Sequence, residues 1–203
     1  MLATASHRPT LILASSSPRR QELAGSLGLP VLIRPSHADE STPAGWAPDR
    51  VVEELAARKA AVVWERSRED VQGPAVVVGS DTIVYIDGRI LGKPRDEADA
   101  EAMLSLLSGR THEVYTGVCC IGLPDGVRVI GHRRTCVRMR ALSTEQIRRY
   151  VASGEPMDKA GAYGIQGLGA VLVESLEGCY FNVVGLPLSL LAVQLESFGV
   201  NLP

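Results

Sequence analysis

The sequence is poor in aromatic residues and has no excess of either charge. Its 203 residues include only two Trp, five Tyr and two Phe, and 21 basic residues balance 23 acidic ones for a net charge of −2. A nucleic-acid-binding protein is expected to present a basic surface, often with aromatic side chains for base stacking. A polybasic membrane anchor needs a similar excess of positive charge. The composition argues against both classes, but it allows a small local cluster of cations.

The sequence also lacks the patterns of membrane proteins and of disulfide-bonded or zinc-binding proteins. No apolar run approaches the roughly 18 residues that suggest a membrane span, and the N-terminal ten residues are too polar for a secretory signal. The four cysteines, at positions 119, 120, 136 and 179, form no C-x-x-C pair and have no zinc-site spacing. We therefore expect small apolar cysteines in the reducing environment of the cytoplasm.

The length and an apolar content of 45% suit a single domain spanning residues 1–203. Strand-like and helix-like segments alternate in the first half and hairpin signals follow, which predicts an α/β fold with a mixed sheet and flanking helices. Partial alternation in the two longest strands predicts an antiparallel pair with one solvated face. The expected strands are 10–14, 31–34, 75–79, 83–86, 89–91, 112–123 and 127–140, and the expected helices are 17–28, 49–65, 96–109, 143–154 and one starting near 187.

Hydroxyl and guanidinium groups gather where the first expected strand meets the first expected helix. Residues 15–17 are serines, Ser17 is the expected N-cap, Pro18 suits the first helical position, and Arg19 and Arg20 follow. A helix N-terminus offers unpaired N–H groups and the positive end of the helix dipole, so it attracts anions and disfavours cations. The two arginines therefore indicate a bound anion. The alternative is an ordinary serine cap with two solvated arginines.

Two carboxylates are candidates for chemistry. Asp81 interrupts the apolar stretch VVVGSDTIVY, and Gly79, Ser80 and Asp81 predict a strand end, where carboxylates line the crevice of many α/β proteins. Asp81 is then a metal ligand or a general base, or else a loop aspartate that bonds its own backbone. Glu40 lies in the acidic loop 36–40. The alternative for this loop is a solvated acidic turn with no functional role.

Two lysines and a glycine-rich segment complete the candidates. Lys59 lies on or beside the apolar stripe of helix 49–65, where it either reaches solvent or points into an anion site. Lys93 is either an exposed lysine or part of the same site. The glycines of segment 161–169 permit close backbone approach, but they match neither a dinucleotide-binding motif nor a P-loop. Gln166 among them could read a base edge. Together, these groups suit a polyphosphate and a divalent metal.

The sequence resembles the Maf family of nucleoside triphosphate pyrophosphatases over nearly its whole length. The resemblance rests on LASSSPRRQEL, ADE at 38–40, ARKA at 57–60, VVGSDTIV, LGKPRD, LSGRTHEVYTGV, DKAGAYGIQGLGA and NVVGLPL, in the family's order. It implies an elongated, two-lobed Maf/ITPase-like fold with a central cleft, and hydrolysis of a nucleoside triphosphate to the monophosphate and pyrophosphate. It also implies a requirement for Mg²⁺ or Mn²⁺, a cytoplasmic location and a possible homodimer.

The resemblance assigns a role to several residues. Asp81 matches the family's proposed proton acceptor, and Arg19, Thr82 and Gln166 match positions associated with base selection. KAGAYGIQG is similar to the branch that acts on dTTP and UTP rather than to the 7-methyl-GTP branch. Glu40 and Asp81 are the expected metal ligands; Asp81 is the base, a ligand, or a ligand of the metal whose water attacks, and we favour Asp81 acting with the metal over Asp81 acting alone.

The remaining active-site positions of the family are expected to hold phosphates. Ser15, Arg20, Lys59 and Lys93 match these positions, and Arg19 is a further candidate. Arginine's planar fork suits two phosphate oxygens at once, whereas lysine acts as a point charge. The alternative function is a nucleotide-binding regulator of cell division without turnover, as the family's historical septum-inhibition label suggests.

Overall fold

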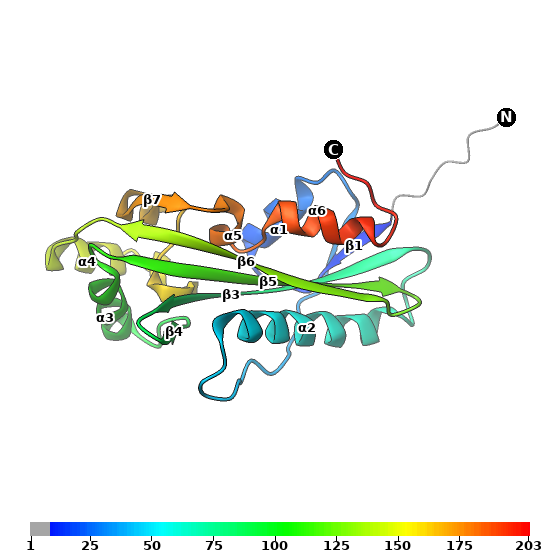
Figure 1. The fold of residues 1–203 in the computed structure, drawn as a ribbon, viewed down its shortest axis with the longest axis horizontal. Coiled ribbons are helices and arrows are strands. Elements are labelled where there is room, and N and C mark those ends of the chain that lie inside the picture. Colours follow the sequence, from blue (N-terminus) through cyan, green and yellow to red (C-terminus); the bar gives the residue numbers. More distant parts are fainter. Residues whose placement is uncertain (1–8) are drawn as a thin grey trace.

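Seven strands form one sheet that runs the length of the molecule (Figure 1). The computed structural model describes residues 9–203. The strands lie in the order β2-β1-β3-β5-β6-β7, and β4 pairs with the end of β3. Their bounds are β1 Thr10–Leu13, β2 Val31–Ile33, β3 Ala75–Ile86, β4 Arg89–Leu91, β5 Thr111–Leu123, β6 Arg128–Met139 and β7 Val173–Glu177.

Helices cover both faces of this sheet. α2 lies along one face, α1, α5 and α6 lie on the other, and α3 and α4 pack together at one end (Figure 1). The helices are α1 Pro18–Gly25, α2 Pro48–Ser67, α3 Glu97–Leu107, α4 Thr144–Val151, α5 Tyr180–Val184 and α6 Leu188–Glu196, and the 3-10 turns are η1 Glu155–Asp158, η2 Ala160–Ala162 and η3 Gly167–Leu172.

The strand pairing confirms the expected mixed α/β sheet. β1 pairs in parallel with β2 and β3, whereas β3, β5, β6 and β7 pair antiparallel in succession. The Asp87-Gly88 turn between β3 and β4 has positive φ at both residues, as a two-residue hairpin requires. The capping box of Ser143 and Gln146 at the start of α4 is also confirmed.

The expected strand end at Gly79, Ser80 and Asp81 is wrong. β3 continues through these residues to Ile86, and Asp81 lies opposite Gly117 in the middle of the β3–β5 pairing. Gly79 serves close packing rather than a turn, because a Cβ atom there would overlap the backbone of α2. Gly-Ser-Asp prefers turns locally, but here these three residues are buried under α2, and this packing overrides the local preference.

The expected solvated face of the long antiparallel pair is wrong for the second half of β5. From Thr116 onward every residue of β5 is buried, because α2 covers one face and α5 and α6 cover the other. Burial alternates in the first half of β5, where His112, Val114 and Thr116 are buried, and in the second half of β6, where Thr135, Val137 and Met139 are buried and Arg138 is exposed. β5 is thus a central strand, with an apolar run typical of strands buried on both faces.

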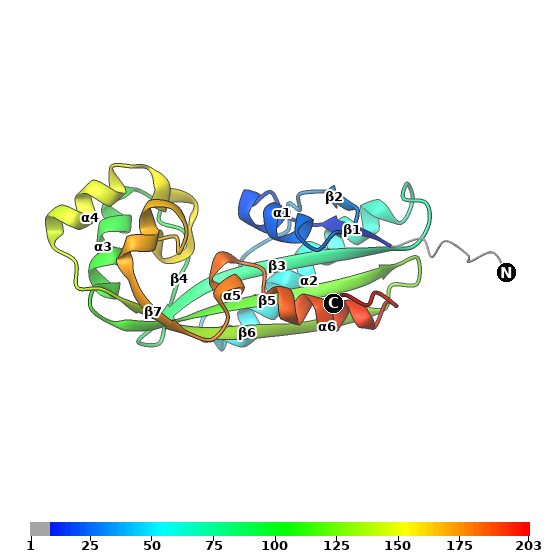
Figure 2. The same cartoon turned by 90° about the horizontal axis from the view of Figure 1, so that it is seen from above.

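The molecule is elongated and has two lobes that share β3, β5 and β6 (Figure 2). In the larger lobe, apolar side chains of α1 and α6 pack on one face of the sheet and those of α2 pack on the other. In the smaller lobe, α3 and α4 pack with the 3-10 turns against the far ends of the long strands. Val78 of β3 therefore belongs to the core of the larger lobe and Val84 to the core of the smaller lobe, and Asp81 lies between them.

Two further expectations concern cysteines and membranes. All four cysteines are unpaired, and Cys119 and Cys120 are buried within β5. Among residues 9–203, no helix combines the length and the apolar composition that crossing a bilayer requires.

Candidate active site

A cleft of about 510 Å³ lies between the two lobes and brings together residues that are far apart in the sequence. Its walls come from the β1–α1 junction, the loop before α2, α2 itself, the middle of β3, the loop after β4 and the segment from η1 to η3. Every site residue expected from the sequence lines this cleft: Ser15, Arg19, Arg20, Glu40, Lys59, Asp81, Thr82, Lys93 and Gln166.

Lys59 links the two expected metal ligands at the base of the cleft. Its Nζ atom lies 2.5 Å from Oδ1 of Asp81 and 2.7 Å from Oε1 of Glu40. Lys59 extends from the face of α2 that packs on β3, so its side chain is only 11% exposed. The structure therefore places this lysine in the site rather than in solvent. A buried carboxylate at Asp81 is tolerated because the ammonium group neutralises it.

The electrostatic environment keeps Glu40 ionised. Partial burial raises the pKa of this carboxyl, but the hydrogen bond and charge of Lys59, together with the charges of Lys93 and Arg20, outweigh burial and lower it. Asp81 and Glu40 thus present two carboxylates to a single cation. Within the described residues no cluster of three or more His, Cys, Asp or Glu side chains could hold a metal. A divalent ion at this pair would need further oxygen ligands, and Mg²⁺ commonly takes them from substrate phosphates and water.

Arg20 is anchored across the cleft rather than free in it. Its Nε atom donates to the carbonyl oxygen of Gly185 at 2.7 Å, and one terminal nitrogen donates to Oγ1 of Thr82 at 2.9 Å. Burial lowers the pKa of the guanidinium group, while the charge of Asp81 opposes this. A guanidinium has five N–H donors, so donors remain for an anion after these two bonds. Thr82 therefore also supports Arg20.

The start of α1 lies against the cleft as the serine-rich pattern indicated. Ser17 occupies the N-cap position, but its side chain makes no capping bond; instead, the backbone N–H of Ser17 donates to Oγ of Ser15 at 3.2 Å. Pro18 begins the helix and lines the cleft together with the serines. The helix N-terminus and its hydroxyls thus face the same space as Lys59.

The opposite wall contains two residues that the sequence reasoning missed. Asp158 accepts from Arg19 at 3.4 Å and from Nζ of Lys159 at 2.7 Å. Both Asp158 and Lys159 line the cleft. They open the segment DKAGAYGIQGLGA, but adjacent opposite charges are typical of a solvated surface, and 139 positions separate Asp158 from Arg19. Lys93 lies beside this wall, because Gly161 donates its N–H to the carbonyl of Gly92 at 3.0 Å.

A buried histidine contacts a tyrosine that lines the cleft. Nε2 of His112 lies 2.7 Å from the hydroxyl of Tyr163, which lines the cleft. His112 is 1% exposed, and its Nδ1 atom has no hydrogen-bond partner. Desolvation lowers the pKa of His112 from 6.5 to about 4, so the folded protein holds a neutral imidazole.

This histidine should make stability depend on pH. The folded pKa is depressed, so between pH 6.5 and 4 the unfolded chain binds a proton that the folded chain does not. The contribution of neutral His112 to the stability of the fold is fully present above pH 6.5 and is lost as the pH falls towards 4. The free energy of unfolding should drop by about 2 kcal/mol between pH 7 and 5, measured by urea denaturation. His112→Gln should remove most of this dependence, whereas His37→Gln, at an exposed loop position, should retain it.

Comparison with known proteins finds relatives over almost the whole chain. The family model for Maf-like proteins matches residues 10–198. The dTTP/UTP pyrophosphatase of Moorella thermoacetica is 52% identical over 191 residues, which cover 94% of this chain and 96% of that protein. The dTTP/UTP pyrophosphatase of Symbiobacterium thermophilum is 50% identical over 190 residues, which cover 93% and 94%.

One solved structure shows a weaker similarity. The Staphylococcus aureus Ham1 protein is 13% identical with a TM-score of 0.43, and the match covers 81% of this chain and 79% of that one. The assignment therefore depends on the family match and the close relatives, which span almost the whole chain. On these grounds, the chain belongs to the Maf-like protein family.

Proposed function

We propose that this protein hydrolyses nucleoside triphosphates to the monophosphate and pyrophosphate, with dTTP, UTP and modified pyrimidine nucleotides as its substrates. The observation that carries the proposal is the Lys59 ammonium group between Asp81 and Glu40, in a cleft also lined by Arg20 and Lys93. Such a site binds polyphosphate and has a carboxylate at its centre. The relatives at about half identity are named for this reaction.

The reaction requires a water molecule to attack the α-phosphorus while pyrophosphate leaves. Negative charge then grows on the phosphate oxygens and the leaving group, so catalysis consists mainly of positioning and charge stabilisation. In our proposal, Arg20, Lys59 and Lys93 supply the positive charge, and the Ser15 hydroxyl donates to a phosphate oxygen. The rigid anchoring of Arg20 fixes its remaining donors before the substrate arrives. Asp81 orients the attacking water and accepts its proton.

Asp81 and Glu40 are also the proposed ligands of Mg²⁺ or Mn²⁺, completed by phosphate oxygens and water. When bound, the ion neutralises phosphate charge and lowers the pKa of a coordinated water. The donor set fits a hard cation, because both groups are carboxylates and both already face one positive charge. The hydrogen bond and charge of Lys59 lower the pKa of Glu40, which favours the ionised form that such a ligand needs.

Base selection is proposed for Arg19, Gln166 and Thr82, the last of which also bonds Arg20. The amide of Gln166 can both donate and accept hydrogen bonds, as the carbonyl and imide groups of thymine and uracil require, whereas the hydroxyl of Thr82 already accepts from Arg20 and lies 2.9 Å from that of Thr116. Arg19 supplies donors only. A site that pairs with these groups rejects a base whose edge leaves its polar atoms unpaired.

The test is a nucleotide panel with separate detection of pyrophosphate, monophosphate and inorganic phosphate. With Mg²⁺ or Mn²⁺, dTTP and UTP should give monophosphate and pyrophosphate in equal amounts, and excess EDTA should stop the reaction. Release of inorganic phosphate instead would contradict attack at the α-phosphorus. Tight binding of nucleotide with no product in a single-turnover experiment would favour the regulator of cell division.

The setting of this activity is part of the proposal. We place the enzyme in the cytoplasm, where it would remove unwanted nucleotides from the pool, and we propose a homodimer with no role for nucleic acid. The near-balanced charge and the scarcity of aromatic residues support the last point.

A further inference from the structure

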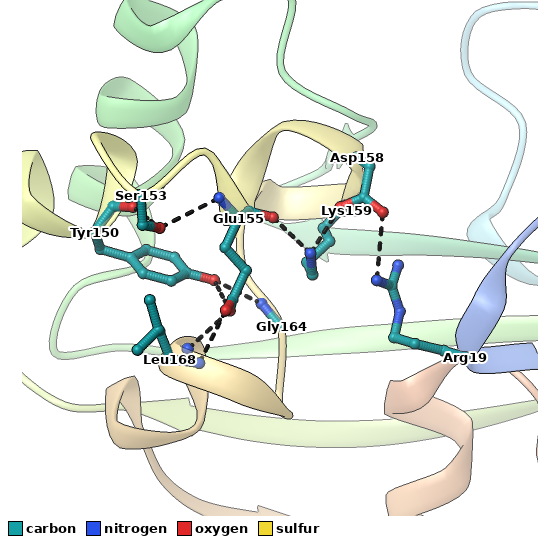
Figure 3. A network of polar contacts seen from close by, with 9 residues as sticks. Arg19, Tyr150, Ser153, Glu155, Asp158, Lys159, Gly164 and Leu168 are labelled. Atoms are coloured by element: carbon teal, nitrogen blue, oxygen red, sulfur yellow. Dashed lines mark hydrogen bonds and ion pairs between the residues drawn. The ribbon is translucent and has the colours of Figure 1, made fainter. Parts of the chain in front are cut away.

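The 3-10 turn η1, Glu155–Asp158, contacts both walls of the cleft (Figure 3). Its first residue bonds the glycine-rich segment that contains Gln166, and its last residue bonds Arg19 on α1. Figure 3 shows these contacts as one network that extends from Tyr150 to Arg19. None of these contacts reaches Lys59 or Asp81. The turn therefore acts on a part of the site separate from the carboxylate pair.

Glu155 fixes the backbone that follows Gln166. Its Oε2 atom accepts from the N–H of Leu168, and its Oε1 atom accepts from the N–H of Gly169, both at 2.9 Å. The hydroxyl of Tyr150 also donates to Oε1 at 2.9 Å and accepts from the N–H of Gly164 at 3.1 Å. Backbone groups on both sides of Gln166 are thus held by one carboxylate and its tyrosine partner.

The glycines of this segment permit these contacts. A Cβ atom at residue 167 would lie 2.7 Å from Oε2 of Glu155, and one at residue 169 would lie 2.5 Å from the Tyr150 hydroxyl. Real Cβ contacts essentially never approach so closely, so glycine at 167 leaves room for the carboxylate, and glycine at 169 leaves room for the tyrosine and for the carbonyl oxygen of Gly164, which would lie 2.3 Å from that Cβ. Gly167 also has a φ of 68°, which glycine adopts readily. Two glycines of the segment, Gly167 and Gly169, thus accommodate Glu155 and Tyr150.

Asp158 and Lys159 connect the same turn to the opposite wall. Nζ of Lys159 donates to the carbonyl of Glu155 at 2.5 Å and to Oδ1 of Asp158 at 2.7 Å, which ties the two ends of the turn together. Oδ2 of Asp158 faces Arg19 at 3.4 Å. An exposed ion pair of this kind adds little to stability, so its consequence is the direction in which Arg19 points.

We propose that η1 is a positioning element for substrate choice, in which Glu155 sets the place of Gln166 and Asp158 sets the orientation of Arg19. Both side chains line the cleft, and one short turn fixes their spacing across it. This inference rests on the proposed function, because it concerns which triphosphate is accepted. Glu155 and Asp158 act through Gln166 and Arg19 and need not touch the substrate.

The test compares UTP with CTP, which differ only at the edge of the pyrimidine ring. The variants are Glu155→Gln and Asp158→Asn, which keep the size of each side chain and remove its charge. Each should lower the UTP/CTP ratio of kcat/KM by roughly tenfold, the effect of one lost charge-assisted hydrogen bond. The loss should appear with UTP alone, because Lys59, Asp81 and the phosphate contacts are unchanged. Glu174→Gln, which breaks an exposed ion pair with Arg138 in the same lobe, should leave the ratio unchanged.

A double-mutant cycle shows whether Asp158 acts through Arg19. If it does, Asp158→Asn should change the UTP/CTP ratio in the native background but have no further effect in an Arg19→Ala background. The corresponding cycle pairs Glu155→Gln with Gln166→Ala. Equal losses with UTP and CTP, additive effects in both cycles, or an unchanged ratio would each overturn the proposal.

Binding measurements separate this inference from the proposed reaction. Dissociation constants for UTP and CTP are measured in EDTA, where no turnover is expected. If the native protein binds UTP preferentially but releases no pyrophosphate with metal, the reaction is refuted, and the variants still test η1 through the ratio of dissociation constants. If the native protein shows no preference in either assay, the inference fails with it.

Discussion

Replacing Asp81 with asparagine should lower pyrophosphate release from dTTP by about 10³-fold while the protein remains folded. Asparagine has nearly the same shape, but its amide cannot accept the proton of the attacking water and is a poor ligand for a divalent ion. Its carbonyl oxygen can still accept from Nζ of Lys59, which lies 2.5 Å from Oδ1 in the native protein. Single-turnover rates measure the loss, and near-UV circular dichroism with a thermal melt reports the fold.

A matched control is available in the turn that follows the same strand. Asp87 lies in the turn after β3, pairs with Arg110 and has a φ of 50°, a conformation that asparagine tolerates well. Asp87→Asn removes the same charge by the same chemical change, so its rate should stay within a factor of two or so of the native rate, as is usual for surface substitutions. Near-normal turnover in Asp81→Asn would contradict the role of this carboxylate as the group that accepts a proton from the attacking water.

The largest loss of stability should follow from Gly117→Ala. A Cβ atom at residue 117 would overlap the carbonyl group of Val52 and lie 2.9 Å from the backbone nitrogen of Glu53, so α2 would have to move away from the sheet. Because those atoms belong to a helix backbone, no side-chain rotation relieves the overlap. The free energy of unfolding should fall by at least about 3 kcal/mol, or the protein should fail to accumulate in soluble form. Urea denaturation and soluble yield give the result.

Gly131→Ala is the control for this substitution. Gly131 also lies in a long strand of the sheet, but a Cβ atom there would meet only the ends of two flexible side chains, Gln194 at 3.4 Å and Leu190 at 3.6 Å. Its effect on stability should be within about 1 kcal/mol. Similar losses in the two alanine variants would mean that the close approach of α2 to β5 is not the cause.

The helix periodicity of the sequence predicts one feature of the site well. Lys59 stands out because it falls on an apolar helical stripe, and in the structure it points inward to Asp81. The strand end predicted at Asp81 is wrong, since Gly-Ser-Asp favours turns locally and only the packing of α2 keeps it in the sheet. A local pattern carries no information about a helix that packs on it from elsewhere in the chain.

Contacts across the cleft were the hardest to predict. Arg20 is anchored by Gly185, 165 positions away, and no local pattern indicates such a partner. The role of Thr82 came from family resemblance alone, because this residue does not stand out by periodicity or charge, whereas Gln166 was a candidate as an amide within the glycine-rich segment. Asp158 and Lys159 were overlooked because an adjacent acid and base are typical of a solvated surface, whereas here they close a turn on the cleft wall.

Because β3 passes through the centre of the molecule, the position of its proposed catalytic carboxylate depends on the stability of the whole fold. Asp81 lies within the longest run of β3–β5 pairing, so its position is lost only when the central sheet itself opens. Gln166 lies in a segment held by side-chain contacts at the edge of the smaller lobe. Substitutions around that segment can therefore alter the preferred base without touching the reacting carboxylate. Over evolutionary time, the preferred nucleotide can drift while the hydrolytic step is retained.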